Sequence, residues 1–189
     1  MKKNCCLWHE PRKSGELPFY LLGTAAAPDE AGAAVVYGDA EMMTFEGRFE
    51  DADVFNHAVR NNEKLWRTGD VMELFLQPDH RSEVYYEFHL TPDGITLQLH
   101  FDSVPTAFEL ASHLCQTNME AEATRTEIGW NGKFRIRAAD FGITDWNLVR
   151  FAVCRYNYTT GREAPEISSS EIFMSGGFHQ PKLWRQVLC

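Results

Sequence analysis

Two alternating runs joined by a short turn constrain the fold of this chain more than any other feature. They are VYYEFHL, residues 84–90, and GITLQLHF, residues 94–101, and each places apolar side chains at every second position. A period of two is that of a β-strand, whose successive side chains point to opposite faces. Between the runs, Pro92 presets the turn and Gly94 supplies positive φ, so the stretch predicts a β-hairpin.

Similar runs recur along the chain and are separated by segments rich in Gly, Pro, Asn and Asp. They are AAVVYG (33–38), MMTFEGRF (42–49), DVMELFLQ (70–77), KFRIRA (133–138), NLVRFAVCRYNY (147–158) and, more weakly, SEIFMS (170–175). About eight or more strands with little helix predict an all-β fold, an antiparallel β-sandwich of jelly-roll or immunoglobulin-like type.

A few segments predict the connections between these strands. Residues 51–62 and 105–115 carry apolar side chains at mixed spacings of three and four, and AADFG, residues 138–142, reads as a single helical turn ended by glycine. We expect these three segments to form short connecting helices. The polar stretch 159–170 contains Gly161 and Pro165 and is predicted to be a mobile loop.

Length and charge limit the domain organisation and the partners. The 189 residues are 44% hydrophobic, so we expect a single domain over residues 1–189, with an N-terminal extension over residues 1–29. The 18 basic and 27 acidic side chains leave a formal charge of -9, which repels polyphosphate. Nucleic acid is therefore not an expected partner.

The N-terminus and the cysteines bear on where the protein works. Charged residues and Pro11 interrupt the stretch MKKNCCLWHEPRK before it could serve as a secretion signal, and no run approaches the roughly 20 apolar residues of a membrane span. We expect a cytoplasmic, soluble protein without a membrane partner. The five cysteines lack disulfide-framework spacing and are expected to be free thiols: Cys5, Cys6, Cys115, Cys154 and Cys189.

The common catalytic motifs of hydrolases, phosphate-binding loops and metalloproteases do not occur in the sequence. Glu73 and Glu87 lie on two predicted strands, and a carboxylate pair across a groove is what glycoside hydrolysis needs. The competing interpretation is an exposed polar sheet face, on which glutamates are common. We expect a protein that is not an enzyme and keep a glycoside-active enzyme as an alternative.

The histidines are scattered, and only His89 and His100 share the predicted hairpin. With a third ligand such as Glu87, they would offer donors that transition metals accept. The competing interpretation is that they are hydrogen-bonding groups on a solvent-facing surface. The metal content is left open.

The predicted strand faces opposite the core collect flat rings and planar polar groups. They are Tyr85, Glu87, His89, Gln98, His100, Arg135, Arg137, Arg150 and Tyr156. Sugars need this mixture, because their C–H faces stack on aromatic rings while their hydroxyls need fixed donors and acceptors. An ordinary sandwich surface would show the same composition, so both interpretations stay open.

The stretch WRTGDVMELFL, residues 66–76, followed by YYEFHLTPDG, resembles the family-nine carbohydrate-binding modules and the wider DOMON-like superfamily. The resemblance continues through KFRIRAADFGI, NLVRFAVCRY and GGFHQPKLWRQVLC, and it covers roughly residues 30–189. It implies a β-sandwich of jelly-roll type that binds a ligand without catalysis.

The resemblance also implies where a sugar would bind. Sugar-binding members clamp a chain end between two tryptophans, and these positions fall on Trp66 and on Phe178, which precedes His179. Here a phenylalanine replaces the second tryptophan. Glu87 and His89 stand where sugar-binding members place an arginine and an amide, so the site becomes acidic.

Bound ions and cofactors are implied less directly. Some relatives carry structural calcium, to which Asp70, Glu73 or Asp102 could contribute oxygens, but no acidic loop has calcium-loop spacing, so calcium is unassigned. Haem-binding relatives use an axial Met and His, for which Met72 and Met174 are the methionines to consider. No cofactor is otherwise expected.

These observations predict a non-catalytic module that binds a carbohydrate or a similar small polar ligand. Its predicted ligand-binding residues are Trp66, Tyr85, Glu87, His89, Gln98, Arg150, Phe178 and His179. The alternatives are a protein-interaction or assembly sandwich that has lost the sugar site, with a protein partner or homo-oligomer, and a glycoside-active enzyme that uses Glu73 and Glu87.

Overall fold

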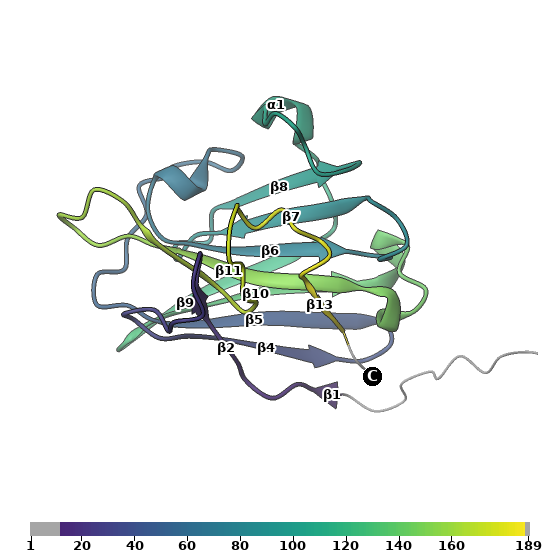
Figure 1. Cartoon of the computed structure of the whole chain (residues 1–189), viewed down its shortest axis with the longest axis horizontal. Helices are drawn as coiled ribbons and strands as arrows, with labels where there is room; N and C mark the ends of the chain where they lie inside the picture. Colours follow the sequence, from purple (N-terminus) through teal and green to yellow (C-terminus); the bar gives the residue numbers. More distant parts are fainter. Residues whose placement is uncertain (1–11, 188–189) are drawn as a thin grey trace, which may run out of the picture.

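A computed structural model describes residues 12–187 of the chain and shows two antiparallel sheets packed face to face (Figure 1). The first sheet has the order β1-β4-β5-β10-β9, and β2 also pairs with β4. Its strands are β1 (Arg12–Lys13), β2 (Leu17–Pro18), β4 (Gly32–Gly38), β5 (Met42–Glu50), β9 (Glu120–Thr126) and β10 (Gly129–Arg137). The predicted antiparallel β-sandwich is confirmed.

The second sheet has the order β3-β12-β11-β6-β7-β8, and β13 also pairs with β11. Its strands are β3 (Tyr20–Leu21), β6 (Val71–Gln77), β7 (Tyr85–Leu90), β8 (Thr96–Phe101), β11 (Arg150–Asn157), β12 (Glu166–Ser169) and β13 (Arg185–Gln186). The predicted hairpin is β7 and β8, with Gly94 at φ 84° in its turn.

The helical predictions are only partly correct. Residues 51–62 form no helix, because the Asp51 and Asn56 side chains accept hydrogen bonds from backbone N–H groups two residues on and favour turns instead. Residues 105–115 contain one turn of helix, α1 (Leu110–His113). The turn at Ala138–Phe141 is confirmed as a 3₁₀ helix that ends at Gly142, with φ 64°. Two further 3₁₀ turns, Leu65–Arg67 and Trp146–Leu148, escaped prediction.

Several strand predictions also need correction. SEIFMS is not a strand, and β12 lies instead within the segment predicted as a mobile loop. The edge strand β9 was missed because its sequence, EAEATRT, has no apolar side chain larger than alanine. The strands β1, β2 and β3 lie within the predicted N-terminal extension, so the described part of that segment already belongs to the two sheets.

The main core lies between the two sheets. Phe45 and Phe134 of the first sheet meet Leu74, Phe88 and Phe151 of the second, and all five side chains are almost completely buried. Burying a large apolar side chain contributes roughly 1.5–3 kcal/mol. This layer therefore supplies most of the energy that holds the sheets together.

A second apolar cluster covers the other face of the second sheet. Phe75, Tyr85, Leu99 and Phe101 project from its strands and pack under Trp184 and other residues of the segments between and after the strands. Figure 1 shows the yellow C-terminal segment passing across β11, β6 and β7, with α1 beside β8. This face was predicted to be exposed to solvent, and that prediction was wrong.

The predicted faces of the hairpin also need correction. Leu90 pairs with Thr96, so the apolar set of β7 faces the main core while Leu97, Leu99 and Phe101 of β8 face the second cluster. A one-residue change of register moves every side chain to the other face of the sheet. The sequence alternation did not determine that register.

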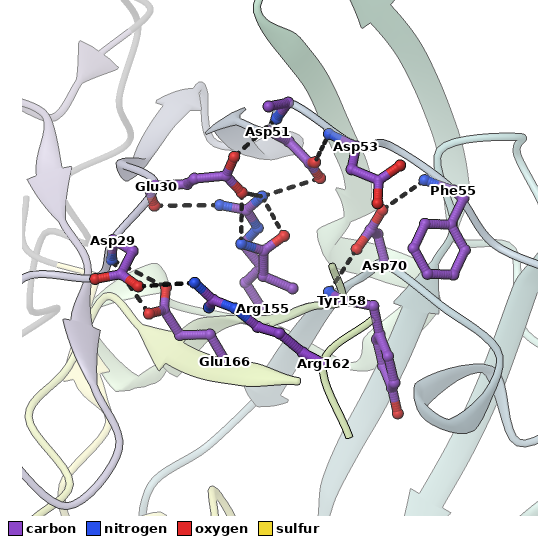
Figure 2. Close-up of polar contacts among 12 residues, drawn as sticks. Asp29, Glu30, Asp51, Asp53, Phe55, Asp70, Arg155, Tyr158, Arg162 and Glu166 are labelled. Atoms are coloured by element: carbon purple, nitrogen blue, oxygen red, sulfur yellow. Dashed lines mark hydrogen bonds and ion pairs between the residues drawn. The ribbon is translucent and has the colours of Figure 1, made fainter. Parts of the chain in front are cut away.

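The buried guanidinium of Arg155, on β11, contacts the segment that begins at Asp51 and leads to the 3₁₀ turn Leu65–Arg67 (Figure 2). Arg155 donates to Asp51 Oδ2 at 3.1 Å, to Asn157 Oδ1 at 2.8 Å and to the Glu30 carbonyl oxygen at 3.3 Å. Its side chain is 1% exposed and that of Asp51 is 0% exposed. The pair therefore replaces water as the partner of both charges.

Asp70 fixes the entry to β6. Its two carboxylate oxygens accept the N–H groups of Phe55 at 2.7 Å and Tyr158 at 2.8 Å (Figure 2), and the Tyr158 hydroxyl donates to the Trp66 carbonyl oxygen at 2.6 Å. Gly69 before it has φ 145°, and a Cβ there would lie 2.4 Å from the Phe55 carbonyl oxygen. Gly69 and Asp70 thus form the predicted corner, and they hold Trp66 in place.

This buried acidic side chain predicts a pH-dependent stability. Burial raises the pKa of Asp70 to about 7, while the N–H groups of Tyr158 and Phe55 oppose the rise. Because the folded state then binds the proton more tightly than the unfolded state, the free energy of unfolding should fall as pH rises from about 4 to 7. We expect Asp70→Asn to flatten that slope in urea titrations across this range. Asp102→Asn, at an exposed loop position, should keep the wild-type slope, and equal slopes for both variants would contradict the assignment.

Candidate functional site

A pocket opens on the loop-covered face of the second sheet. The cavity has a volume of about 210 Å³. It is lined by Leu22, Trp66, Glu73, Phe75, Glu87, Phe108, Tyr156, Gly177, Phe178 and His179. The strands β6, β7 and β11 supply its floor, and the segments before β6, after β8 and before β13 supply its walls.

Aromatic rings form much of the pocket wall. Trp66 is half-buried and packs against Phe108 at 5.8 Å and His89 at 5.4 Å between ring centroids. Phe178 meets Phe75 edge to face at 6.0 Å and is only 4% exposed. Trp66 therefore offers a ring to a ligand, whereas Phe178 serves mainly as a packed wall.

A chain of polar side chains lies at the floor of the pocket and directly beneath it. His89 Nε2 lies 2.6 Å from Glu87 Oε1, and His89 Nδ1 lies 3.2 Å from Glu73 Oε1. Glu87 Oε2 is 3.4 Å from His179 Nε2, and the Tyr85 hydroxyl is 2.6 Å from His179 Nδ1. Period-two side-chain geometry and the pairing of Glu73 with His89 across β6 and β7 bring these groups together.

Burial determines the protonation behaviour of this floor. It raises the pKa of Glu73 to about 8, although the nearby His89 opposes the rise. Burial lowers the pKa of His89, but the charges of Glu73 and Glu87 outweigh it and the net pKa is raised. The pKa of His179 is lowered, chiefly by burial. The floor thus combines proton acceptors and donors whose charges depend on one another.

The structure brings together six of the eight predicted ligand-binding residues. Trp66, Glu87, Phe178 and His179 line the pocket. Tyr85 and His89 are completely buried behind them and contact His179, Glu87 or Trp66. These two side chains orient pocket residues and do not themselves line the pocket.

The other two predicted residues lie elsewhere. Gln98 pairs with Phe88 and projects from the opposite face of the sheet, where its Oε1 accepts hydrogen bonds from Thr117. The missed register of the hairpin explains this error. Arg150 is the first residue of β11, whereas Tyr156 near the other end of that strand lines the pocket. The Arg150 Nη1 lies 3.4 Å from the Pro181 carbonyl oxygen, and Arg150 does not line the pocket.

Sequence reasoning missed several lining residues. Leu22, Phe75 and Phe108 were not proposed as ligand contacts, and Tyr156 was noted only as a polar-face residue. Leu22 and Phe108 come from loops whose path no strand pattern predicts. Phe75 could have been found, because it shares the face of Glu73 on β6.

The predicted ion and cofactor residues are dispersed. Asp70 is occupied by two backbone N–H groups and Asp102 is exposed, so neither joins Glu73 in a cluster. Met72 is buried in the main core and Met174 is exposed. Cys115 and Cys154 are free thiols, while Cys5, Cys6 and Cys189 lie outside the described residues. Within residues 12–187, no helix is long and apolar enough to span a membrane.

Comparison with solved structures places this architecture in a known class, the fold of the family-nine carbohydrate-binding modules. A candidate carbohydrate-binding protein from Bacteroides uniformis matches with a TM-score of 0.64 and 14% identity, over 90% of this chain and 84% of that one. A family 9 carbohydrate-binding module from Caldicellulosiruptor kristjanssonii in complex with cellotriose matches with a TM-score of 0.60 and 8% identity, over 90% and 79%.

A family 9 module from the same organism in complex with glucose matches with a TM-score of 0.60 and 8% identity, over 88% of this chain and 81% of that one. No family model matches the sequence, and no curated protein matches it. The family-nine resemblance is therefore confirmed for the fold, and at these identities the likeness establishes the fold alone. The DOMON-like part of the resemblance stays a prediction.

Proposed function

We propose that this chain is a non-catalytic module that binds one sugar ring in the pocket beside Trp66. The observation that carries the proposal is the combination of a half-buried indole ring with the polar groups of Glu87 and His179 in one cavity. The apolar face of a pyranose stacks on such a ring, and its hydroxyls donate to carboxylate and imidazole acceptors.

The size of the pocket supports recognition of a single ring. Its volume of about 210 Å³ lies below the roughly 300–1,000 Å³ of pockets that enclose drug-sized ligands. A terminal ring of an oligosaccharide or a free monosaccharide suits such a space. The fold neighbours solved with cellotriose and with glucose add support, because they show that this fold carries saccharide sites.

The charge of the pocket distinguishes it from an arginine-based sugar site. Among the described residues, no Lys or Arg lines it, and Glu73 and Glu87 lie at its floor. Glu87 keeps one carboxylate oxygen, Oε2, without a hydrogen bond. We expect this oxygen to accept a sugar hydroxyl, a charge-assisted hydrogen bond worth about 1.5–3 kcal/mol.

Calorimetric titration with glucose, cellotriose and a wider glycan panel tests this function. We expect at least one saccharide to bind and Glu87→Gln to weaken it by roughly tenfold or more, because the charged acceptor is lost. Glu120→Gln, on the exposed strand β9, is the matched control and should leave the affinity unchanged. Absence of binding to every glycan in the panel would refute the proposal.

A second candidate function is glycoside hydrolysis by Glu73 and Glu87. The observation that favours it is that both carboxylates line the same pocket, and one oxygen of each lies within 4.8 Å of the other. Retaining glycosidases hold their two carboxyl groups about 5–5.5 Å apart. Release of nitrophenol from aryl glycosides, abolished by Glu73→Gln, would establish this activity, and saccharide binding without turnover would exclude it for the sugars that bind.

A further inference from the structure

Three residues that can bind a metal ion converge on the pocket floor. Glu73, Glu87 and His89 each offer one ligand atom, and these atoms lie within 4.8 Å of one another. All three residues are buried. Their positions are set by paired strands rather than by a loop, since Glu73 pairs directly with His89 and Glu87 lies two residues before it. Rigid elements hold such groups more precisely than loops do.

Two atoms of this cluster are buried without a hydrogen bond. They are Glu87 Oε2 and His89 Nδ1, although the latter lies 3.2 Å from Glu73 Oε1. Leaving a buried polar group unpaired costs about 1–3 kcal/mol, and more when the group is charged. Both atoms carry lone pairs that a cation would accept. Among the described residues, the imidazole rings of His89 and His179 are therefore the groups that could bring positive charge to these carboxylates.

The surrounding residues do not supply that charge. No Lys or Arg of the described residues lines the pocket. The contrast with the buried carboxylate of Asp51 is direct, since there the Arg155 guanidinium lies 3.1 Å away. At the pocket floor, the negative charge of the carboxylates is neutralised either by protonated imidazole rings or by a cation that binds from solution.

We propose that Glu73, Glu87 and His89 bind one divalent first-row transition-metal ion, with Zn²⁺ as the reference ion. Mixed carboxylate and imidazole ligands suit such ions, whereas Ca²⁺ takes six to eight oxygen ligands that this floor does not offer. His179 provides a fourth ligand through Nε2, which lies 3.4 Å from Glu87 Oε2. The Tyr85 hydroxyl at His179 Nδ1 orients that ring, as outer hydrogen bonds do in metal sites.

This inference goes beyond the proposed function and does not depend on it. A protein that binds Zn²⁺ and no saccharide would refute sugar binding while supporting the metal site. A protein that binds a saccharide equally well with or without chelator, and no metal, would do the reverse. The two proposals therefore fail separately.

Isothermal titration of the chelator-treated full chain with ZnCl₂ tests the site. We expect one Zn²⁺ per chain, an affinity at least 100-fold lower in Glu87→Gln and in His89→Gln, and no comparable binding of CaCl₂. His100→Gln is the matched control, because that histidine lies on the opposite face of the sheet. Cys5→Ser/Cys6→Ser tests for binding by the N-terminal thiols and should leave the affinity unchanged.

Crystals soaked in ZnCl₂ provide a second measurement that does not depend on the folding of the variants. We expect an anomalous peak at about 2.0–2.2 Å from ligand atoms of Glu73, Glu87 and His89. Three outcomes would each overturn the proposal: no peak at the pocket floor, an affinity that Glu87→Gln and His89→Gln leave unchanged in folded protein, or binding that disappears in Cys5→Ser/Cys6→Ser.

Discussion

Replacement of Trp66 by alanine should reduce saccharide affinity by about 10- to 100-fold. The indole ring is half-buried in the pocket, and the Tyr158 hydroxyl fixes the backbone of Trp66 by donating to its carbonyl oxygen. A stacking contact contributes about 0.5–1.5 kcal/mol beyond the area that it buries. Loss of that contact and of the buried area together accounts for the expected decrease.

The control for this prediction keeps the ring and changes its size. Trp66→Phe should retain part of the affinity, because a smaller ring still stacks on a sugar face. Thermal unfolding of both variants separates ligand contact from packing. If Trp66→Ala lowers the melting temperature and leaves saccharide affinity at the wild-type value, Trp66 is a packing residue and the proposed site is wrong.

Replacement of Arg155 by methionine should have the largest effect on stability, a loss of about 3–5 kcal/mol. The guanidinium is the buried partner of Asp51, and its removal leaves Asp51 Oδ2 and the Asn157 amide oxygen without their donor. Urea unfolding near neutral pH measures the change. Because this network anchors the segment that leads to Trp66, we also expect weaker saccharide binding in whatever fraction stays folded.

Arg162→Met is the matched control for this substitution. Arg162 donates to Asp29 at 3.2 Å, but the two side chains are 50% and 71% exposed. Exposed ion pairs contribute about 0–1 kcal/mol, so this variant should unfold within about 1 kcal/mol of the wild type. Equal losses in the two variants would show that burial of the Arg155 pair is not what stabilises the fold.

The strand pattern predicted the fold because most strands have one face in an apolar layer. β4, β5, β6 and β10 follow their alternating runs closely, and the glycines at positions 94 and 142 end the turns that were assigned to them. The edge strand β9 and the two-residue strands escaped prediction. The two-residue strands β1 and β2 are held by pairing with β4, which is distant in sequence, and no local pattern reports that pairing. β9 forms a tight hairpin with β10, but it carries no large apolar side chain that would mark it as a strand.

The sequence also predicted part of the candidate site. Trp66 and Phe178 came from the family resemblance, and Glu87 from the alternation of β7. Gln98 was misplaced because the register of β8 is set by the pairing of Leu90 with Thr96, and the alternation allowed either face. The cover of loops over the second sheet turned an expected open face into a small pocket, and loop paths depend on tertiary contacts.

Glu73 was not among the predicted ligand-binding residues, and its position in the pocket is the difference from prediction that matters most for function. The sequence left open whether Glu73 is a catalytic residue or a polar strand residue. In the structure its side chain lines the pocket, and Glu73 Oε1 lies 3.2 Å from His89 Nδ1. Asp70, three residues earlier, is structural and holds the backbone of the same stretch. One short segment thus supplies the ring, the corner that positions it and a buried carboxyl group.

A crystal structure of the chain grown with the saccharide that calorimetry identifies would show directly whether the pocket binds sugar. We expect one sugar ring in the pocket, stacked on Trp66, with a hydroxyl within hydrogen-bond distance of Glu87. A saccharide bound on another face of the sandwich, with the pocket free of sugar in the same crystal, would contradict it.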